Sequence, residues 1–137
     1  MIDRVTVHVD GGARGNPGPA AVAAVATDPE GNPLAERNAY IGHATNNVAE
    51  YRAVLLALEL ARDLGAREIE VVNDSELVAR QIGGEYKVKN AALRELFVET
   101  MRQLREFDRW KVRNVRREHN VRADELVNEA LDEASRA

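Results

Sequence analysis

The chain has 137 residues, of which 45% are hydrophobic and 31% are charged, a length and balance that suit one domain with its own core over residues 1–137. Its net charge of −4 excludes a generally polybasic nucleic-acid binder, so contact with nucleic acid must come from local patches or from bound cations. The absence of cysteine excludes disulfides, thiolate zinc sites and cysteine nucleophiles, and without a membrane-span or signal-peptide pattern we expect a cytoplasmic monomer.

The first third of the chain has the pattern of three consecutive strands. Valine alternates with polar residues over residues 3–9, which predicts a half-buried strand that ends at Asp10. A turn rich in glycine and proline follows, and residues 20–27 form a small apolar strand. A tight hairpin connection then leads into a third strand over residues 34–41, which we expect to end at Gly42.

The rest of the chain alternates between helical and strand patterns. Residues 47–64 are apolar almost all round, which predicts a buried helix, and Gly65 is a natural stop for it. The remaining elements are a strand at 67–72, helices at 74–82 and 90–107, a strand at 110–117 and a closing helix at 122–135. The order βββαβααβα indicates an α/β fold with a mixed sheet flanked by helices.

Four acidic residues fall where predicted strands end and predicted helices begin. Asp10 ends the first strand, Glu50 lies early in the long helix, Asp74 follows the fourth strand, and Asp124 opens the last helix. In open α/β sheets, ligands bind at the carboxyl ends of strands. Carboxylates clustered there without His or Cys are the ligands that Mg²⁺ and Mn²⁺ prefer.

Each acid also has a purely structural interpretation. Glu50 and Asn47 match a capping box, Asp74 can cap the short helix, Asp124 suits the helix dipole, and Asp10 can begin a turn. Taken singly, these interpretations are favoured. Four unpaired acids around one site would repel one another unless cations bind, so taken together they favour a two-metal site.

Four sequence blocks resemble the signatures of type 1 ribonuclease H, in the short form without a long basic protrusion. They begin at Asp10 (DGGARGNPGP), Thr45 (TNNVAEY), Asn73 (NDSELV) and Ala123 (ADELVNEA), in the family's order. The resemblance implies a five-stranded mixed sheet flanked by helices. It also implies endonucleolytic hydrolysis of the RNA strand of RNA/DNA hybrids, with 5′-phosphate and 3′-hydroxyl products.

The resemblance also implies roles for individual residues. The four acids, Asp10, Glu50, Asp74 and Asp124, would be catalytic and would hold two Mg²⁺ or Mn²⁺ ions, without a small-molecule cofactor. Asp10 would bridge the ions, with Asp124 on the nucleophile side and Glu50 and Asp74 on the leaving-group side.

The residues that would read the substrate come from the first two blocks. Asn16, Asn46 and Asn47 would contact RNA sugars in the minor groove, where the 2′-hydroxyl separates RNA from DNA. Thr45 would help grip a phosphate of the DNA strand.

Weaker candidates surround these residues. Glu76 stands where many relatives carry a glutamine that contacts RNA, and a carboxylate accepts from a 2′-hydroxyl but cannot donate to it. His119 lies five residues before Asp124, closer than the catalytic loop histidine of many relatives, so it is either that residue or an ordinary loop histidine. Lys87 and Lys89 occupy the short segment where some relatives insert the basic protrusion.

Positive charge is concentrated late in the chain. Residues 102–122 hold eight Lys and Arg against three acids. Lys111 and Arg113 alternate outward along a strand, as a solvated face would, whereas Arg116, Arg117 and Arg122 lie nearer Asp124 and are better placed for phosphate contact.

Two other functions remain open from the sequence. A 3′–5′ exonuclease of a related fold would carry Asp-x-Glu on the first strand, whereas Asp10 is followed by two glycines. A non-catalytic module that binds hybrids or duplexes is the other alternative, and product analysis would separate the three.

Overall fold

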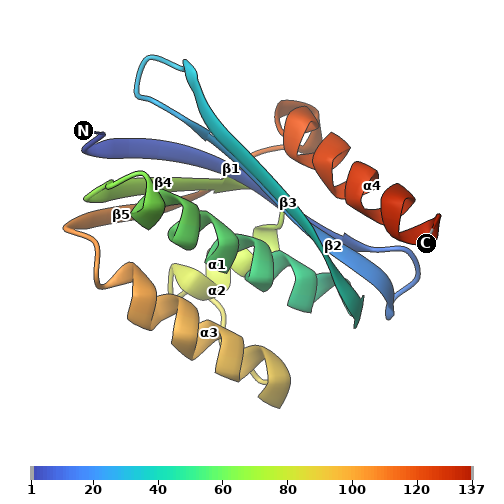
Figure 1. The fold of residues 1–137 in the computed structure, drawn as a ribbon. Coiled ribbons are helices and arrows are strands. Elements are labelled where there is room, and N and C mark those ends of the chain that lie inside the picture. Colours follow the sequence, from blue (N-terminus) through green and yellow to red (C-terminus); the bar gives the residue numbers. More distant parts are fainter. Residues whose placement is uncertain (1, 137) are drawn as a thin grey trace.

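The protein is described here by a computed structural model, in which residues 2–136 are placed. Five strands form one sheet in the order β3-β2-β1-β4-β5 (Figure 1). They are β1 (Arg4–Ala13), β2 (Gly18–Thr27), β3 (Pro33–Ala44), β4 (Glu68–Asn73) and β5 (Arg109–Asn114). The first three strands run antiparallel, and β4 and β5 add to the other side of β1 in parallel. This confirms the predicted mixed sheet.

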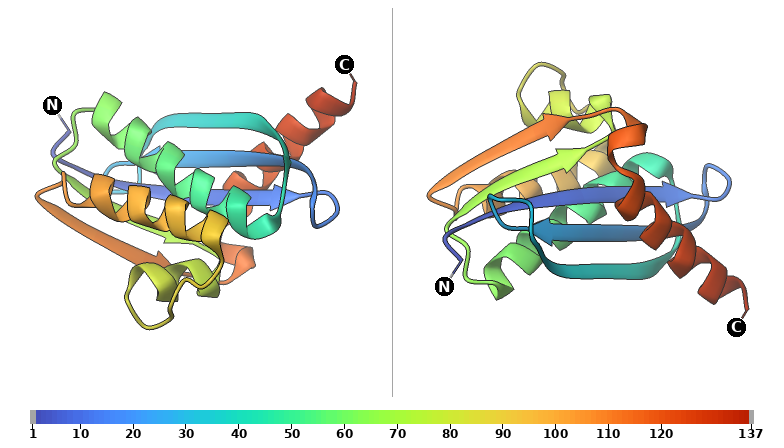
Figure 2. Two further views of the ribbon diagram at one scale, coloured as in Figure 1. Left: turned by 90° about the horizontal axis from the view of Figure 1, so that it is seen from below. Right: turned by 90° about the horizontal axis from the view of Figure 1, so that it is seen from above.

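Four α-helices cover the two faces of this sheet. They are α1 (Asn46–Asp63), α2 (Glu76–Ile82), α3 (Ala91–Leu104) and α4 (Val121–Ser135), and a single 3₁₀ turn, η1 (Arg117–His119), precedes α4. The two further views show α1 and α3 over one face and α4 over the opposite face (Figure 2). No helix among residues 2–136 is long and apolar enough to cross a membrane.

The core is divided unequally between the two faces. The valines of β1 turn toward α1 and α3 and pack with Tyr51, Leu58 and Leu104, which are at most 1% exposed. The core under α4 is smaller and consists of alanines of β2 against Leu126, Val127, Ala130 and Leu131. Most of the apolar burial therefore lies on the α1 side.

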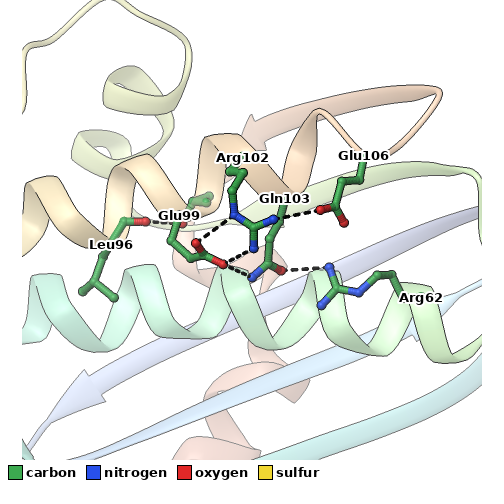
Figure 3. Close-up of polar contacts among 7 residues, drawn as sticks. Arg62, Leu96, Glu99, Arg102, Gln103 and Glu106 are labelled. Atoms are coloured by element: carbon green, nitrogen blue, oxygen red, sulfur yellow. Dashed lines mark hydrogen bonds and ion pairs between the residues drawn. The ribbon is translucent and has the colours of Figure 1, made fainter.

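Polar contacts link the outer surfaces of α1 and α3. Gln103 of α3 accepts a hydrogen bond from Arg62 of α1 at 2.8 Å, and Arg102 pairs with Glu99 within α3 and with Glu106 just beyond its end (Figure 3). Hydrogen bonds from Arg102 and Gln103 lower the pKa of Glu99 to about 2. These groups are solvent-exposed, so the apolar stripe beneath contributes more to holding α3.

Three strands end at least three residues from where the sequence predicts. β1 runs on to Ala13 because Gly11 and Gly12 pair with residues of β2, so Asp10 lies inside the strand rather than at its end. β3 continues past Gly42, which has φ +82° and follows a register shift, so this glycine forms a bulge and not a stop. β5 ends at Asn114, and Arg117 belongs to η1.

The helix stop at Gly65 is confirmed. Gly65 has φ +78°, and its N–H donates to Arg62 while the next N–H donates to Ala61. These two bonds form a Schellman motif, which only a residue tolerant of positive φ closes without strain.

Candidate active site

Asp10 and Asp74 meet at one edge of the sheet because β1 and β4 are parallel neighbours. His8 of β1 pairs with Val72 of β4, two residues before each acid. Two residues further along, both chains reach the carboxyl end of the parallel part of the sheet. The strand pairing therefore brings the two carboxylates together, although they are 64 positions apart in the sequence.

Two of the structural interpretations of these acids are wrong. Thr45, not Asn47, caps α1, since its hydroxyl accepts a hydrogen bond from the Val48 N–H at 3.2 Å, so Glu50 is not part of a capping box. Ser75, not Asp74, caps α2, and its hydroxyl accepts from the Val78 N–H at 3.3 Å. Helix capping therefore does not explain why Glu50 and Asp74 are acidic.

The other two structural interpretations have different outcomes. Asp124 lies in the first turn of α4, where the helix dipole favours a carboxylate, so that interpretation stands beside the functional one. Asp10 begins no turn, because it pairs with Ala23 within the β1–β2 ladder.

All four acids line one cavity of about 350 Å³ at the sheet edge. Each comes from a different element: β1, α1, the segment after β4, and α4. Gly11, Arg14, Asn46, Arg117 and Asn128 are among the other residues that line this cavity. The acid cavity, as we call it, is therefore lined by four carboxylates and two arginines.

The charges of these acids are poorly compensated. Burial, together with the charges of Asp74 and Asp124, raises the pKa of Asp10 to about 8. Burial also raises the pKa of Glu50 and of Asp74, although the positive charge of Arg117 opposes the rise at Asp74. Glu50 Oε2 is buried and has no hydrogen-bond partner in the described part of the chain. A bound cation would supply the missing compensation.

The donor set suits hard divalent cations. It consists of carboxylate oxygens, with neither Cys nor His among the cavity's lining residues. Within residues 2–136 no three His, Asp or Glu side chains are already arranged as a metal-ligand set. The orphaned Glu50 oxygen and the raised pKa of Asp10 are the features that fit a cation here.

The predicted substrate-reading residues gather beside this cavity, at the start of α1 and the tip of the β1–β2 hairpin. Asn16 Oδ1 accepts from the Asn46 N–H at 3.0 Å, and Asn46 Oδ1 accepts from the Ala13 N–H at 2.8 Å. Thr45 caps the helix in which Asn46 and Asn47 are the first two residues. Hairpin and helix are thereby held as one unit.

The weaker candidates are scattered. Arg117 lines the acid cavity, whereas Arg116, the preceding residue, is exposed and is not among the residues that line it. Glu76 is exposed and paired with Arg80 at 2.8 Å, and Lys87 and Lys89 are exposed in the α2–α3 connection. Two candidates lie away from the acids. His119 and Arg122 line a separate pocket together with His8, and Arg122 also pairs with Glu36 at 2.7 Å.

Sequence reasoning missed two polar residues near the acids. Arg14 extends from the hairpin to the acid cavity and pairs with Asp132 of α4 at 2.7 Å. Asn120 is 2% exposed and donates to the Val9 carbonyl at 2.8 Å, and its hydrogen bond to Asp74 opposes the rise that burial causes in the pKa of that carboxyl. Arg14 lies within the first quoted block, but no spacing rule marks Asn120, because its partners are distant in sequence.

Comparison with known proteins points to one family. Residues 8–130 match the family described as reverse transcriptase-like. The chain is 47% identical over 131 residues to the ribonuclease HI of Halobacterium salinarum, covering 96% of this chain and 66% of that protein. The crystal structure of the ribonuclease H1 from that archaeon superposes with a TM-score of 0.93 at 46% identity, covering 95% of this chain and 98% of that one.

Two further relatives extend the comparison. A ribonuclease H1 isolated from compost, solved in complex with an RNA/DNA hybrid, has a TM-score of 0.91 and 48% identity, covering 95% of this chain and 98% of that one. A bifunctional protein of Mycobacterium tuberculosis is 44% identical over 98% of this chain, but the match covers 37% of that protein. The chain thus spans just under two thirds of the archaeal relative and about a third of the mycobacterial one.

Proposed function

Because the chain belongs to the type 1 ribonuclease H family, we propose that it is an endoribonuclease that hydrolyses the RNA strand of RNA/DNA hybrids. The products would carry 5′-phosphate and 3′-hydroxyl ends. The observation that supports this most is the convergence of four carboxylates from four separate elements in one cavity. A relative of 48% identity was solved with such a hybrid, which supports the choice of substrate.

Two divalent cations, Mg²⁺ or Mn²⁺, are the cofactors of this proposal. When bound, they activate water for attack and stabilise the charge that develops on the phosphate. Asp10 and Asp124 would hold the ion on the nucleophile side, while Glu50, Asp74 and again Asp10 would hold the other. The uncompensated charge of Asp10 and the unpartnered oxygen of Glu50 support these assignments.

The asparagines beside the cavity would select RNA over DNA. Asn16 and Asn46 each use their carbonyl oxygen on a backbone N–H, which orients their NH₂ groups away from those bonds. Neither NH₂ group donates to another residue within 2–136, so both are available to substrate oxygens. A 2′-hydroxyl can accept such a bond, and deoxyribose offers none at that position.

The test is cleavage of an end-labelled RNA/DNA hybrid beside single-stranded RNA, duplex DNA and double-stranded RNA, with Mg²⁺, Mn²⁺ or EDTA. Internal, metal-dependent cuts in the RNA strand of the hybrid are expected. Stepwise shortening from a 3′ end would instead indicate an exonuclease, and binding without cleavage under any metal would indicate a non-catalytic module.

The assignment of the acids is tested by Asp74→Asn. This change keeps the side-chain volume but removes a charged ligand, so we expect at least a roughly hundredfold loss of cleavage with the fold intact. Circular dichroism and thermal unfolding provide the folding control. Retained activity in the folded variant would contradict the proposed role of Asp74.

A further inference from the structure

One half of the sheet has a face that no helix within residues 2–136 covers. Helix α4 packs on β1, β2 and β3, and β4 and β5 lie uncovered beside it when the molecule is seen from above (Figure 2). Asp10 also lies on this face. Side chains alternate along a strand, so Asp10 points to the same side as His8, whereas the valines of β1 point to the other side, toward α1.

The register gives the uncovered face a regular charge pattern. Two rows of three residues cross it, Arg4–Glu68–Arg109 and Thr6–Glu70–Lys111, and Arg113 follows on β5. Along these rows four cationic side chains stand beside two carboxylates, Glu68 and Glu70, and Asp10 lies on the same face at the acid cavity. The chain as a whole carries a net charge of −4, so this face departs from the rest of the surface in sign.

The carboxylates neutralise the cations only weakly. Arg109 is 3.8 Å from Glu68 with its side chain 84% exposed, and Arg113 is 3.5 Å from Glu70. Lys111 makes no ion pair with any residue in the range 2–136. Exposed contacts of this length contribute little, so the cations remain available to another anion.

The cations form a row that leads to the acid cavity. Alternate residues of a strand lie roughly 6.6 Å apart, which is comparable with the spacing of phosphates along one nucleic-acid strand. Arg109, Lys111 and Arg113 follow β5 in this way, and the chain then continues through Arg116 to Arg117, which lines the cavity. We call these five residues the β5 row.

We propose that the β5 row binds the phosphates of a single-stranded extension of the substrate, where it leaves the acid cavity on the side away from Asn16 and Asn46. The inference rests on the proposed function. A single line of cations matches one strand, whereas a duplex presents two backbones. The hybrid itself would be held on the other side of the cavity, by the hairpin and the start of α1.

The experiment compares a blunt hybrid with the same hybrid carrying a single-stranded tail of about ten nucleotides, at either end of either strand. The KM for cleavage is measured for the wild type and for Arg109→Gln/Lys111→Gln. A charge-matched control, Arg105→Gln/Arg136→Gln, removes two exposed cations that lie outside the row.

We expect one tail position to lower the wild-type KM by about threefold to tenfold, with kcat unchanged. The row variant should lose this advantage and still cleave the blunt hybrid normally, while the control should keep it. Binding of the tail alone, measured by fluorescence anisotropy, should have a salt slope lower by about 1.4 in the row variant.

Three outcomes would overturn the proposal. They are a tail that gives no advantage at any position, an advantage that survives in the row variant, and an equal loss on blunt and tailed hybrids, which would assign the row to the duplex. Failure of the proposed function is separate, because it would appear as absence of wild-type cleavage of the blunt hybrid. Anisotropy of the tail alone tests the row in that case too.

Discussion

Asp10 is the residue on which burial and repulsion act most strongly in the acid cavity. Its pKa of about 8 means that the folded chain holds a proton that the unfolded chain, with an ordinary value of 3.8, releases. Between about pH 4 and pH 8 the folded state therefore binds more protons, so the free energy of unfolding of the metal-free protein falls as the pH rises. Above about pH 8 Asp10 is ionised in the folded state too, and the free energy of unfolding is lowered by the full cost of that buried charge.

Asp10→Asn removes this cost because an amide does not ionise. In EDTA we expect the variant to be about 1–3 kcal/mol more stable than the wild type at pH 8.5, which lies above the raised pKa, and nearly equal to it near pH 4. Urea unfolding at the two pH values measures the difference. A stability gain that does not change with pH would show that ionisation of Asp10 does not destabilise the folded state. Added Mg²⁺ should stabilise the wild type but not the variant.

At the level of elements, the contact between β1 and α1 explains why a glycine follows Asp10. A Cβ built on Gly11 would lie 2.2 Å from the Ala49 carbonyl oxygen of α1, whereas one on Gly12 would meet nothing within 4 Å. Two adjacent glycines that look alike in the sequence thus have different functions. Gly11 allows the helix that carries Glu50 to approach the strand that carries Asp10.

Gly11→Ala should therefore separate α1 from β1, at a cost of about 2–4 kcal/mol in the free energy of unfolding. Gly12→Ala is the matched control, and we expect it to be neutral or to stabilise by about 0.5 kcal/mol. Thermal and urea unfolding of the two variants provide the comparison. Equal effects would contradict the close approach.

At the scale of the whole molecule, the two faces of the sheet differ in how firmly they hold their helices. The α1 face buries large side chains such as Tyr51 and Leu58, while α4 rests mainly on alanines through Leu126 and Leu131. Since α4 carries Asp124, the helix that lies over the smaller of the two cores supplies one of the four acids. Opening of α4 would dismantle the cavity without unfolding the main core.

Native-state hydrogen exchange tests this difference. Amides of α4 should exchange through an opening of lower free energy than those of α1. Correspondingly, Leu131→Ala should cost about 2–3 kcal/mol and Leu58→Ala about 3–5 kcal/mol. A common opening energy for both helices would instead show that the two faces unfold as one unit.

Local sequence patterns were sufficient for the order of elements, for the helix stop at Gly65 and for selecting four acids that line one cavity in the structure. Valine alternation, helical apolar stripes and glycine punctuation are short-range signals, and the family's motifs are contiguous blocks. The ends of β1 and β3 were predicted wrongly because pairing with β2 extends both strands through glycines that otherwise indicate turns.

Only the tertiary structure decided which residues meet. The parallel pairing of β1 with β4 brings Asp10 to Asp74. The tertiary structure also places Arg14 and Asn120 near the acids and Arg122 away from them. These outcomes depend on contacts between residues up to 118 positions apart, for which a chain read residue by residue carries no local signal.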